Sequence, residues 1–311
     1  MSHFSRRDFL AAAASTAAVS MLPASSAVKA DPLKLPVGVQ LYTVSEELKK
    51  DLDGTLQKIA AIGYRTVETA SFTSNIKATQ MREALDRAGL ACQSAHYGLP
   101  QLLGGAQQAI DDAHQLGAKY VVCSAPWVAD MSRFANVAKG NKPEAAFAAL
   151  MGSFTMDDWR WNAEQFNKAG ENLKKAGLQF AYHNHGFEFK KIDGKLAFDE
   201  LLAMTDPNLV AIEMDCGWVA NAGHDPIEYL KRFPNRIQLL HVKDIKRNAG
   251  ENLSFEMEGT EIGKGILDWP AIFKAAKQAG LKGYFVEQEP PFARPPLEEL
   301  QASYAYLHKL S

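Results

Sequence analysis

The sequence predicts a (β/α)8 TIM barrel, a closed sheet of parallel strands that alternate with helices. A short phrase recurs along the chain, in which an amphipathic helix ends at a glycine and an apolar run follows. The runs are apolar on both faces, as is typical of parallel strands covered by helices on each side. Eight such runs fit within residues 31–311, and neither GxGxxG nor GxxxxGK[ST] occurs. This combination favours a barrel over an open, nucleotide-binding sheet.

The repeated units can be placed in order along the chain. Glycine ends the helices because it adopts left-handed backbone at low cost, and the glycines concerned are Gly63, Gly89, Gly117, Gly177 and Gly280. The predicted strands are 37–42, 64–69, 90–96, 119–125, 178–183, 209–215, 236–242 and 283–288. The predicted helices are 53–62, 77–88, 104–116, 157–176, 225–232, 268–279 and 296–309.

Two connections are unusually long, at residues 126–156 and 243–267. Both follow a predicted strand, so in a barrel both lie on the face where the carboxyl ends of the strands meet. Active sites of such barrels are built on that face. We therefore expect the two connections to act as lids over a site.

The first thirty residues differ in character from the rest. "SRRDFL" pairs two arginines, an Ala-rich stretch follows, and small residues end the segment. This order is typical of a twin-arginine export signal. We expect the Tat export machinery to carry the folded protein to the periplasm, with 1–30 as signal peptide and 31–311 as one barrel domain. The alternative is a disordered leader without a targeting role.

Composition excludes several classes of function. The formal net charge of −2 and the isoelectric point near 6.5 provide no field that would gather nucleic acid. After residue 30 no apolar run approaches the roughly 20 residues of a membrane-spanning helix, so we expect no membrane contact in the mature form. Three cysteines without CxxC spacing argue against a disulfide framework.

Polar side chains gather where the predicted strands end. Four of the eight histidines stand there, namely His96, His183, His185 and His241. Carboxylates occupy other strand ends, at Glu68, Glu213, Asp215, Glu287 and Glu289. Because strand ends converge in a barrel, these groups suit one divalent cation, and mixed nitrogen and oxygen ligands accept zinc, manganese, cobalt or iron. Glu213 is two residues before Asp215, so we expect it one layer deeper, in the core or a salt bridge.

Five strings follow one another in a distinctive order: "GVQLYTVSE", "YHNHGFEF", "EMDCGWVANAGHDP", "LLHVKD" and "FVEQE". Together they resemble the sugar phosphate isomerase/epimerase family with its xylose isomerase-like barrel. The resemblance extends over about residues 37–308. It implies one divalent cation held at the ends of the fifth to eighth strands.

Carried onto this sequence, the resemblance implies Asp215, His241 and Glu287 as metal ligands. The fifth strand supplies a glutamate in well-studied ketose epimerases of this fold, and here the matching residue is His183. His185 is the alternative, since the register of "YHNH" is open by a residue. The histidine weakens a two-glutamate epimerase mechanism, because a metal-bound imidazole cannot take up a proton.

The chemistry expected of this site is metal-assisted removal of a proton next to a sugar carbonyl, through an enediolate. The candidate proton acceptors are Glu287, His185, Glu68 and Lys243. The candidate substrate-binding residues are Gln40, His96, Asn184, Glu188, Trp218 and Arg247. Glu68 and His96 are equally compatible with a supporting position behind the site.

Three functions remain open at this level. The first is an isomerase or epimerase of a non-phosphorylated sugar, since a phosphorylated substrate is not expected outside the cytoplasm. The second is a lyase or hydratase that acts on a keto-sugar or keto-glycoside with the same metal site. The third is a sugar-binding barrel without catalysis. A nuclease of this fold is disfavoured by the acidic isoelectric point.

Overall fold

The computed structural model describes residues 32–70, 76–246 and 252–310. The predicted signal peptide, 1–30, lies outside these residues, as does Arg247. Within them, no helix combines the length and apolar character needed to cross a membrane.

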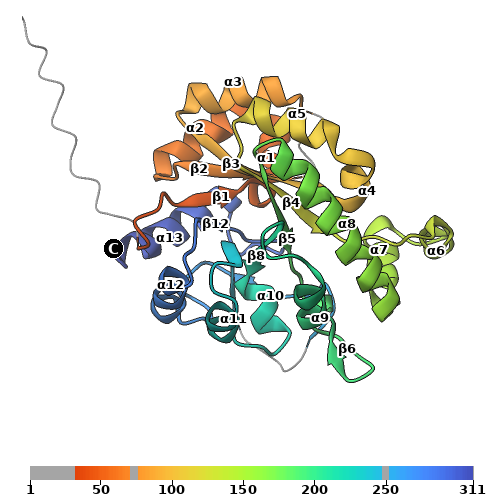
Figure 1. Ribbon diagram of the computed structural model, residues 1–311. Helices are drawn as coiled ribbons and strands as arrows, with labels where there is room; N and C mark the ends of the chain where they lie inside the picture. The colour runs from red at the N-terminus through yellow and green to blue at the C-terminus, as the bar shows by residue number, and fades with distance from the viewer. Residues whose placement is uncertain (1–31, 71–75, 247–251, 311) are drawn as a thin grey trace, which may run out of the picture.

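Eight parallel strands close into a barrel (Figure 1). They are β1 (Gly38–Gln40), β2 (Thr66–Thr69), β3 (Ala91–Gly98), β4 (Tyr120–Ala125), β5 (Gln179–His183), β8 (Val210–Asp215), β9 (Ile237–Val242) and β12 (Gly283–Val286). Each strand pairs with its neighbours in the chain, and β1 pairs with β12 to complete the ring. All eight strands overlap their predicted ranges, which confirms the predicted fold class.

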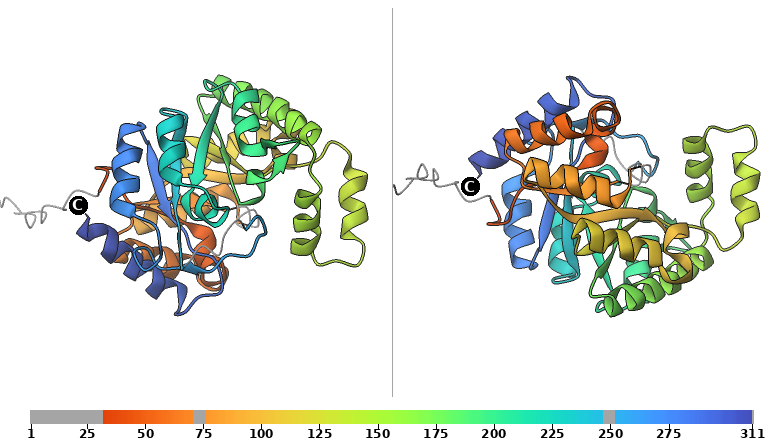
Figure 2. Two further views of the ribbon diagram at one scale, coloured as in Figure 1. Left: turned by 90° about the horizontal axis from the view of Figure 1, so that it is seen from below. Right: turned by 90° about the horizontal axis from the view of Figure 1, so that it is seen from above.

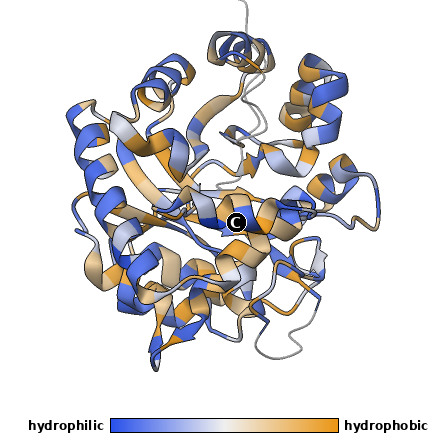
Figure 3. Ribbon diagram, turned by 90° about the vertical axis from the view of Figure 1, so that its right-hand side faces the viewer, coloured by the Kyte–Doolittle hydropathy of each residue, from blue (hydrophilic) through white to orange (hydrophobic). Residues whose placement is uncertain are grey.

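Helices surround the barrel and carry hydrophobic and hydrophilic stripes (Figure 3). They are α1 (Ser45–Lys50), α2 (Leu52–Ile62), α3 (Ala78–Ala88), α4 (Leu99–Leu102), α5 (Gln107–Leu116), α8 (Met156–Lys175), α9 (Ala197–Met204), α10 (Cys216–Asn221), α11 (Pro226–Arg232), α12 (Trp269–Gln278) and α13 (Pro296–Lys309). Helix α8 shows the principle, since Trp159, Phe166 and Leu173 recur every seventh residue and are all buried.

The glycines end the helices as predicted. Gly89 and Gly117 have φ angles of 70° and 72°, and their N–H groups donate to carbonyl oxygens in the last turns of α3 and α5. This is the left-handed cap that a residue with a Cβ rarely adopts.

The connection at 126–156 is not an extended loop. It contains two helices, α6 (Met131–Ala138) and α7 (Pro143–Gly152), which form a pair that stands out to one side of the barrel (Figure 2). The pair still reaches the mouth, because the ring of Phe147 lies 5.5 Å from that of Phe255. Two small antiparallel pairs of strands lie outside the barrel sheet. One joins β6 (Lys191–Ile192) to β7 (Lys195–Leu196), and the other joins β10 (Asp244–Ile245) to β11 (Gly259–Thr260).

The interior of the barrel is filled by an apolar layer made of Tyr120, Val122, Ala181, Ala211, Leu239 and Phe285. Successive inward-facing residues of a strand are two positions apart. The next inward residues on the last four strands are therefore polar: His183, Glu213, His241 and Glu287. The polar layer of the mouth thus lies on an apolar floor that excludes water from below.

One buried carboxylate fixes the second long connection. Asp244 accepts hydrogen bonds from the backbone N–H groups of Ile245, Gly263, Gly265 and Leu267, and from Nε1 of Trp269. The side chain is fully buried. Because buried donors that lose their acceptor are costly, this carboxylate holds the segment that leads from β9 to α12.

We expect Asp244→Ala to lower the free energy of unfolding by roughly 3–5 kcal/mol, since several buried N–H groups lose their acceptor together. Chemical denaturation of the purified protein measures the change. Asp225→Ala is the matched control, because Asp225 is an exposed helix cap and its loss costs about 1 kcal/mol. A change no larger than that of the control contradicts the role given to Asp244.

Candidate metal centre

The outer part of the mouth is formed by the ends of β8, β9 and β12. Asp215 pairs in register with His241, and His241 with Phe285, which places Glu287 just beyond. His241 Nδ1 lies 2.9 Å from Glu287 Oε2 and 3.7 Å from Asp215 Oδ2. These three residues bring one ligand atom each within 4.8 Å of the others, and we call them the outer set.

Lys243 is buried against the outer set. Its Nζ lies 2.7 Å from Glu287 Oε2, 2.9 Å from Asp215 Oδ2 and 2.5 Å from Glu289 Oε1. The same nitrogen lies 5.3 Å from the centre of the Trp218 ring. One ammonium group therefore faces carboxylates from two strand ends.

A second group of candidate ligands lies on the other side of His241, and we call it the inner set: Glu68, His96, His183 and Glu213. His96 Nε2 lies 2.7 Å from Glu213 Oε2 and 2.9 Å from Glu68 Oε1. His183 Nδ1 lies 3.3 Å from the same Glu213 oxygen. His96, His183 and Glu213, together with His241, bring ligand atoms within 4.8 Å of one another.

His241 joins the two sets through its two ring nitrogens. Nδ1 faces Glu287 and Asp215, whereas Nε2 lies 2.7 Å from Glu68 Oε1 and 3.3 Å from Glu213 Oε2. The predicted ligands are therefore divided, since Asp215, His241 and Glu287 are in the outer set and His183 belongs to the inner one.

Burial and charge act against each other at this mouth. Burial by itself lowers the pKa of His96, but the carboxylates of Glu68 and Glu213 outweigh it and raise that pKa to about 9. Burial also opposes the charge of Lys243, yet Asp215, Glu287 and Glu289 hold its pKa well above the usual value. Burial, together with the charge of Glu68, raises the pKa of Glu213. These contacts raise the pKa of Lys243 rather than lower it, so they do not favour Lys243 as a proton acceptor.

The side chains present fit a divalent cation. Carboxylates from Glu68, Glu213, Asp215, Glu287 and Glu289 face one lysine and three imidazoles, so fixed negative charge exceeds fixed positive charge. Among the described residues, Asp215 Oδ2, Glu213 Oε1 and His183 Nδ1 are buried without a hydrogen-bond partner. Lys243 lies within 3 Å of Asp215 Oδ2 without making a directed hydrogen bond to it. Unpaired buried carboxylate and imidazole atoms are the donors that such a cation takes.

The residues that follow β5 have different roles. Asn184 Oδ1 accepts a hydrogen bond from the backbone N–H of Asp215 and so joins the ends of β5 and β8. Glu188 is fully buried and accepts from Tyr182 Oη and from the N–H of His185. Both residues were predicted to bind substrate, and the structure places their side chains in contacts that shape the turn.

His185 lies outside both sets. Its ring is enclosed by the rings of Phe187, Trp218 and Phe255, at centroid distances of 5.6, 5.8 and 5.7 Å. Burial and then the nearby Lys243 charge lower its pKa to about 3. The imidazole is therefore neutral, and it is a weak proton acceptor.

Gln40 supports the inner set from behind, because its Nε2 donates to Glu68 Oε1 at 2.7 Å. Trp218 is nearly fully buried, and its Nε1–H finds no acceptor within the described parts of the chain. Gln40 and Trp218 were both predicted to bind substrate, and the indole of Trp218 is the better placed of the two to do so. Arg247, also predicted to bind substrate, falls in a segment that is not described.

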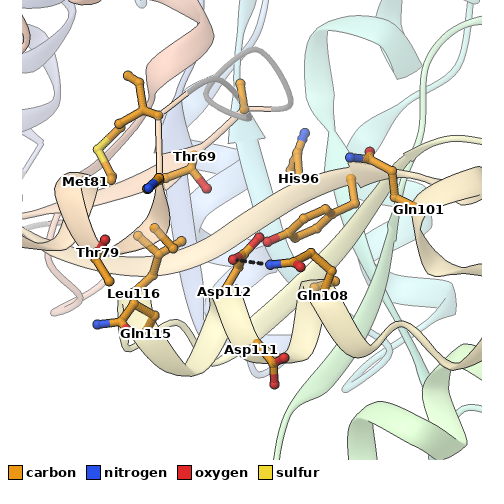
Figure 4. A pocket seen from close by; sticks show the side chains of 16 residues that line it. Thr69, Thr79, Met81, His96, Gln101, Gln108, Asp111, Asp112, Gln115 and Leu116 are labelled. Carbon is orange, nitrogen blue, oxygen red and sulfur yellow. Dashed lines mark hydrogen bonds between the residues drawn. The ribbon is translucent and has the colours of Figure 1, made fainter.

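Two cavities flank the polar mouth. The larger, about 620 Å³, lies over β2 and β3, where His96 and Thr69 face it together with Tyr97 and residues of α3 and α5 (Figure 4). The smaller, about 240 Å³, is lined by Trp218, Phe255, Glu289 and neighbouring residues. The polar groups of the mouth can thus be approached from two sides.

Sequence reasoning left Glu213 and Glu289 out of the site. Glu213 stands on the same face of its strand as Asp215, and that alternation was the available signal. Glu289 stands at a predicted strand end before two prolines, and its side chain, 32% exposed, reaches Lys243. Only the packing of Lys243 shows this contact.

We expect Glu188→Gln to change the pH dependence of stability. Burial raises the pKa of Glu188 from 4.5 to about 7, so the folded state binds this proton more tightly than the unfolded state. Wild-type stability therefore falls as pH rises from about 4.5 through 7, and glutamine removes this loss. From pH 5 to pH 7.5, the free energy of unfolding of the variant minus that of the wild type should increase by roughly 2–3 kcal/mol.

Denaturation at a series of pH values measures that difference. The exposed Glu164→Gln is the control and should stay parallel to the wild type. If the free energy of unfolding of Glu188→Gln differs from that of the wild type by the same amount at every pH from 5 to 7.5, the raised pKa assigned to Glu188 is wrong.

Comparison with known proteins places this chain in a family. The sequence model for the xylose isomerase-like TIM barrel matches residues 56–310. An inosose dehydratase from Clostridium perfringens is 33% identical over 153 residues, which are 45% of this chain and 50% of that protein. Another from Geobacillus kaustophilus is 25% identical over 264 residues, 78% of this chain and 82% of that protein. The chain thus spans about half the length of the first of these relatives.

A solved structure extends the likeness over the whole barrel. A sugar phosphate isomerase/epimerase from Parabacteroides distasonis is 28% identical, with a TM-score of 0.71 over 91% of this chain and 96% of that one. Both the sequence model and this structure cover the strands that carry the outer and inner sets. The chain therefore belongs to the family of xylose isomerase-like TIM barrels.

Proposed function

We propose that this protein is a metal-dependent enzyme that removes a proton next to the carbonyl of a non-phosphorylated sugar or sugar derivative, and so isomerises or epimerises it. The observation that carries the proposal is the outer set with Lys243. It gathers Asp215, His241 and Glu287 from three neighbouring strands around one ammonium group in a buried mouth. The mixed nitrogen and oxygen ligands of the outer set suit manganese, zinc, cobalt or iron.

In this proposal Asp215, His241 and Glu287 hold the cation, and His183 as a fourth ligand stays a prediction. A bound divalent cation polarises a carbonyl and stabilises the negative charge that develops on its oxygen. The apolar layer beneath the mouth keeps water away, which strengthens these electrostatic interactions.

The residues nearest the carbonyl oxygen of the substrate would transfer the proton. Glu287 and Lys243 are bonded to each other at the outer set, where a substrate carbonyl would lie. Glu289 extends this pair toward the smaller cavity. Glu68 is less suited, because Gln40, Ser94, His96 and His241 already engage its oxygens, and His185 is a weak acceptor.

The smaller cavity suits the apolar face of a sugar ring. Trp218 and Phe255 line it, and the unpaired Nε1–H of Trp218 is available to a hydroxyl. Aromatic faces with a polar tip are typical of sites that bind amphipathic ligands. A sugar-binding barrel without catalysis would use the same wall, but it would not need Lys243 among buried carboxylates.

A second candidate, dehydration or β-elimination on a keto-sugar or keto-glycoside, begins with the same proton removal. The relatives named inosose dehydratase favour it. So does the Lys243–Glu289 contact, because an ammonium group next to an accessible carboxyl can donate a hydrogen bond to a leaving hydroxyl.

The leader sequence completes the proposal. With two arginines followed by an Ala-rich stretch, it supports export through the Tat machinery to the periplasm. There, a non-phosphorylated carbohydrate is the natural partner of the site. Fractionation of cells that produce the full chain, compared with a variant in which Arg6 and Arg7 are replaced by lysine, tests this assignment.

We expect Asp215→Ala to lower the bound metal by about one ion per chain while the barrel still folds. The carboxylate is a ligand of the outer set, and its removal leaves two side chains to hold the cation. Metal content by mass spectrometry and folding by circular dichroism provide the readout. Glu164→Gln is the surface control, and unchanged metal content in Asp215→Ala refutes the ligand assignment.

We expect incubation with keto-sugars and keto-glycosides in D₂O to place deuterium on the carbon next to the carbonyl. NMR separates the candidates, because an isomerase or epimerase returns an isomeric sugar that carries the deuterium, whereas a lyase releases water or an alcohol and forms an unsaturated ketone. The Asp215→Ala variant is the control and should show background exchange. Binding without exchange across the substrate panel would leave only the sugar-binding barrel.

A further inference from the structure

One glycine in the wall of the smaller cavity is required neither by its backbone nor by its packing. Gly259 begins β11, which pairs with β10 outside the barrel sheet. Its φ angle lies outside the positive range that favours glycine, so any L-residue can adopt this backbone. A Cβ at this position would lie 3.8 Å from its nearest neighbour, the backbone oxygen of Glu289, which is an ordinary van der Waals contact.

Other glycines near the mouth have a structural reason. A Cβ at Gly217 would lie 2.9 Å from the side chain of Lys243, and a Cβ at Gly265 would overlap the carboxylate of Asp244. Gly259 has no such neighbour, and a glycine within a strand lowers stability because it adds freedom to the unfolded chain. A glycine of this kind often marks a place where a ligand approaches the backbone closely.

The cavity that Gly259 lines suits one sugar ring. Its volume is about 240 Å³, and Trp218, Phe255 and Glu289 also line it. This volume is below the roughly 300 Å³ at which sites for drug-sized ligands begin, so it favours a single ring. Nε1 of Trp218 is buried and has no partner among the described residues, so a ligand hydroxyl is the acceptor that it lacks.

The aromatic wall of this cavity lies next to the groups proposed to react. Lys243 Nζ is 5.3 Å from the centre of the Trp218 ring and 2.7 Å from Glu287 Oε2. A sugar ring stacked on Trp218 therefore presents one edge to Lys243 and Glu287. The substituents on its other edge extend along the cavity wall, where Gly259 has no side chain.

We propose that Gly259 is a specificity-determining residue, whose missing side chain leaves room for an exocyclic carbon on the ring of the substrate. The preferred substrate class is then a six-carbon sugar or derivative with a hydroxymethyl or equivalent group, in preference to a pentose. The inference rests on the proposed function for the identity of the ligand as a sugar. It does not depend on which reaction follows the removal of the proton.

D-Glucose and D-xylose are a matched pair of probes, because their pyranose rings differ only in the hydroxymethyl group. Calorimetric titration of the full-length protein measures the dissociation constant of each sugar. We expect the wild type to bind glucose about tenfold more tightly than xylose, and Gly259→Ala to weaken glucose binding by about tenfold. Gly259→Val should weaken it further, whereas xylose binding should change less than about threefold.

Stability distinguishes recognition from a structural need for glycine. Alanine restricts the unfolded chain, so the midpoint of thermal unfolding of Gly259→Ala should equal or exceed that of the wild type. Gly152→Ala is the matched control, because Gly152 has no positive φ, no atom within 4 Å of its Cβ position and no place in the cavity wall. It should leave both dissociation constants unchanged. A clear loss of stability in Gly259→Ala means that the fold requires the glycine, and it overturns the proposal.

The outcomes separate this inference from the proposed function. Equal weakening of glucose and xylose in Gly259→Ala, a wild type without preference for glucose, or binding of neither sugar overturns the role of Gly259. Deuterium exchange by the wild type then still supports the proposed reaction. Conversely, a preference for glucose that is lost in Gly259→Ala, in a protein that exchanges deuterium into no keto-sugar, keeps the specificity and overturns the reaction.

Discussion

Pairing between β1 and β12 closes the sheet, and the rest of the molecule depends on that closure. In an open sheet, β2 and β9 would lie far apart. In the ring, Glu68 from β2 lies 2.7 Å from His241 of β9. All strands run in one direction, so their carboxyl ends meet at one mouth and their side chains alternate between that mouth and the surrounding helices. A short strand of three residues, β1, completes this arrangement.

The mouth places charges where an ordinary core would place apolar groups. Removing carboxylates and an ammonium group from water is costly, and their mutual attraction offsets that cost only where contacts are close and complete. Here several contacts are close, yet within the described part of the chain Asp215, Glu213 and His183 each retain a buried atom without a hydrogen-bond partner. Buried polar atoms without partners are typical of functional sites, whereas the rest of a fold usually avoids them. The apolar floor and the Asp244 anchor supply the rigidity that holds these groups in place.

The position of each histidine shows why spacing alone was insufficient. His183 and His185 are two residues apart, and the sequence left open which of them meets a cation. The structure turns Nδ1 of His183 toward Glu213, whereas aromatic rings enclose His185. The reason is that β5 ends at His183 and the chain then turns, with Glu188 holding the N–H of His185. A turn breaks the alternation on which a strand-based prediction rests.

Some features were determined by the sequence alone, because they depend on local chemistry. Apolar runs, helix periodicity and glycine caps predicted the eight strands and the order of the units, and the strand ends indicated where polar groups meet. The α6–α7 pair was missed, although Asp130 caps the start of α6 and Pro143 begins α7, which are start signals that the sequence carries. Tertiary structure alone decided which groups touch: Glu289 with Lys243, Glu213 with His96 and His183, and His241 between two sets of ligands. Those contacts join residues far apart in the chain, and pairing of neighbouring strands together with closure of the barrel brings them within contact distance.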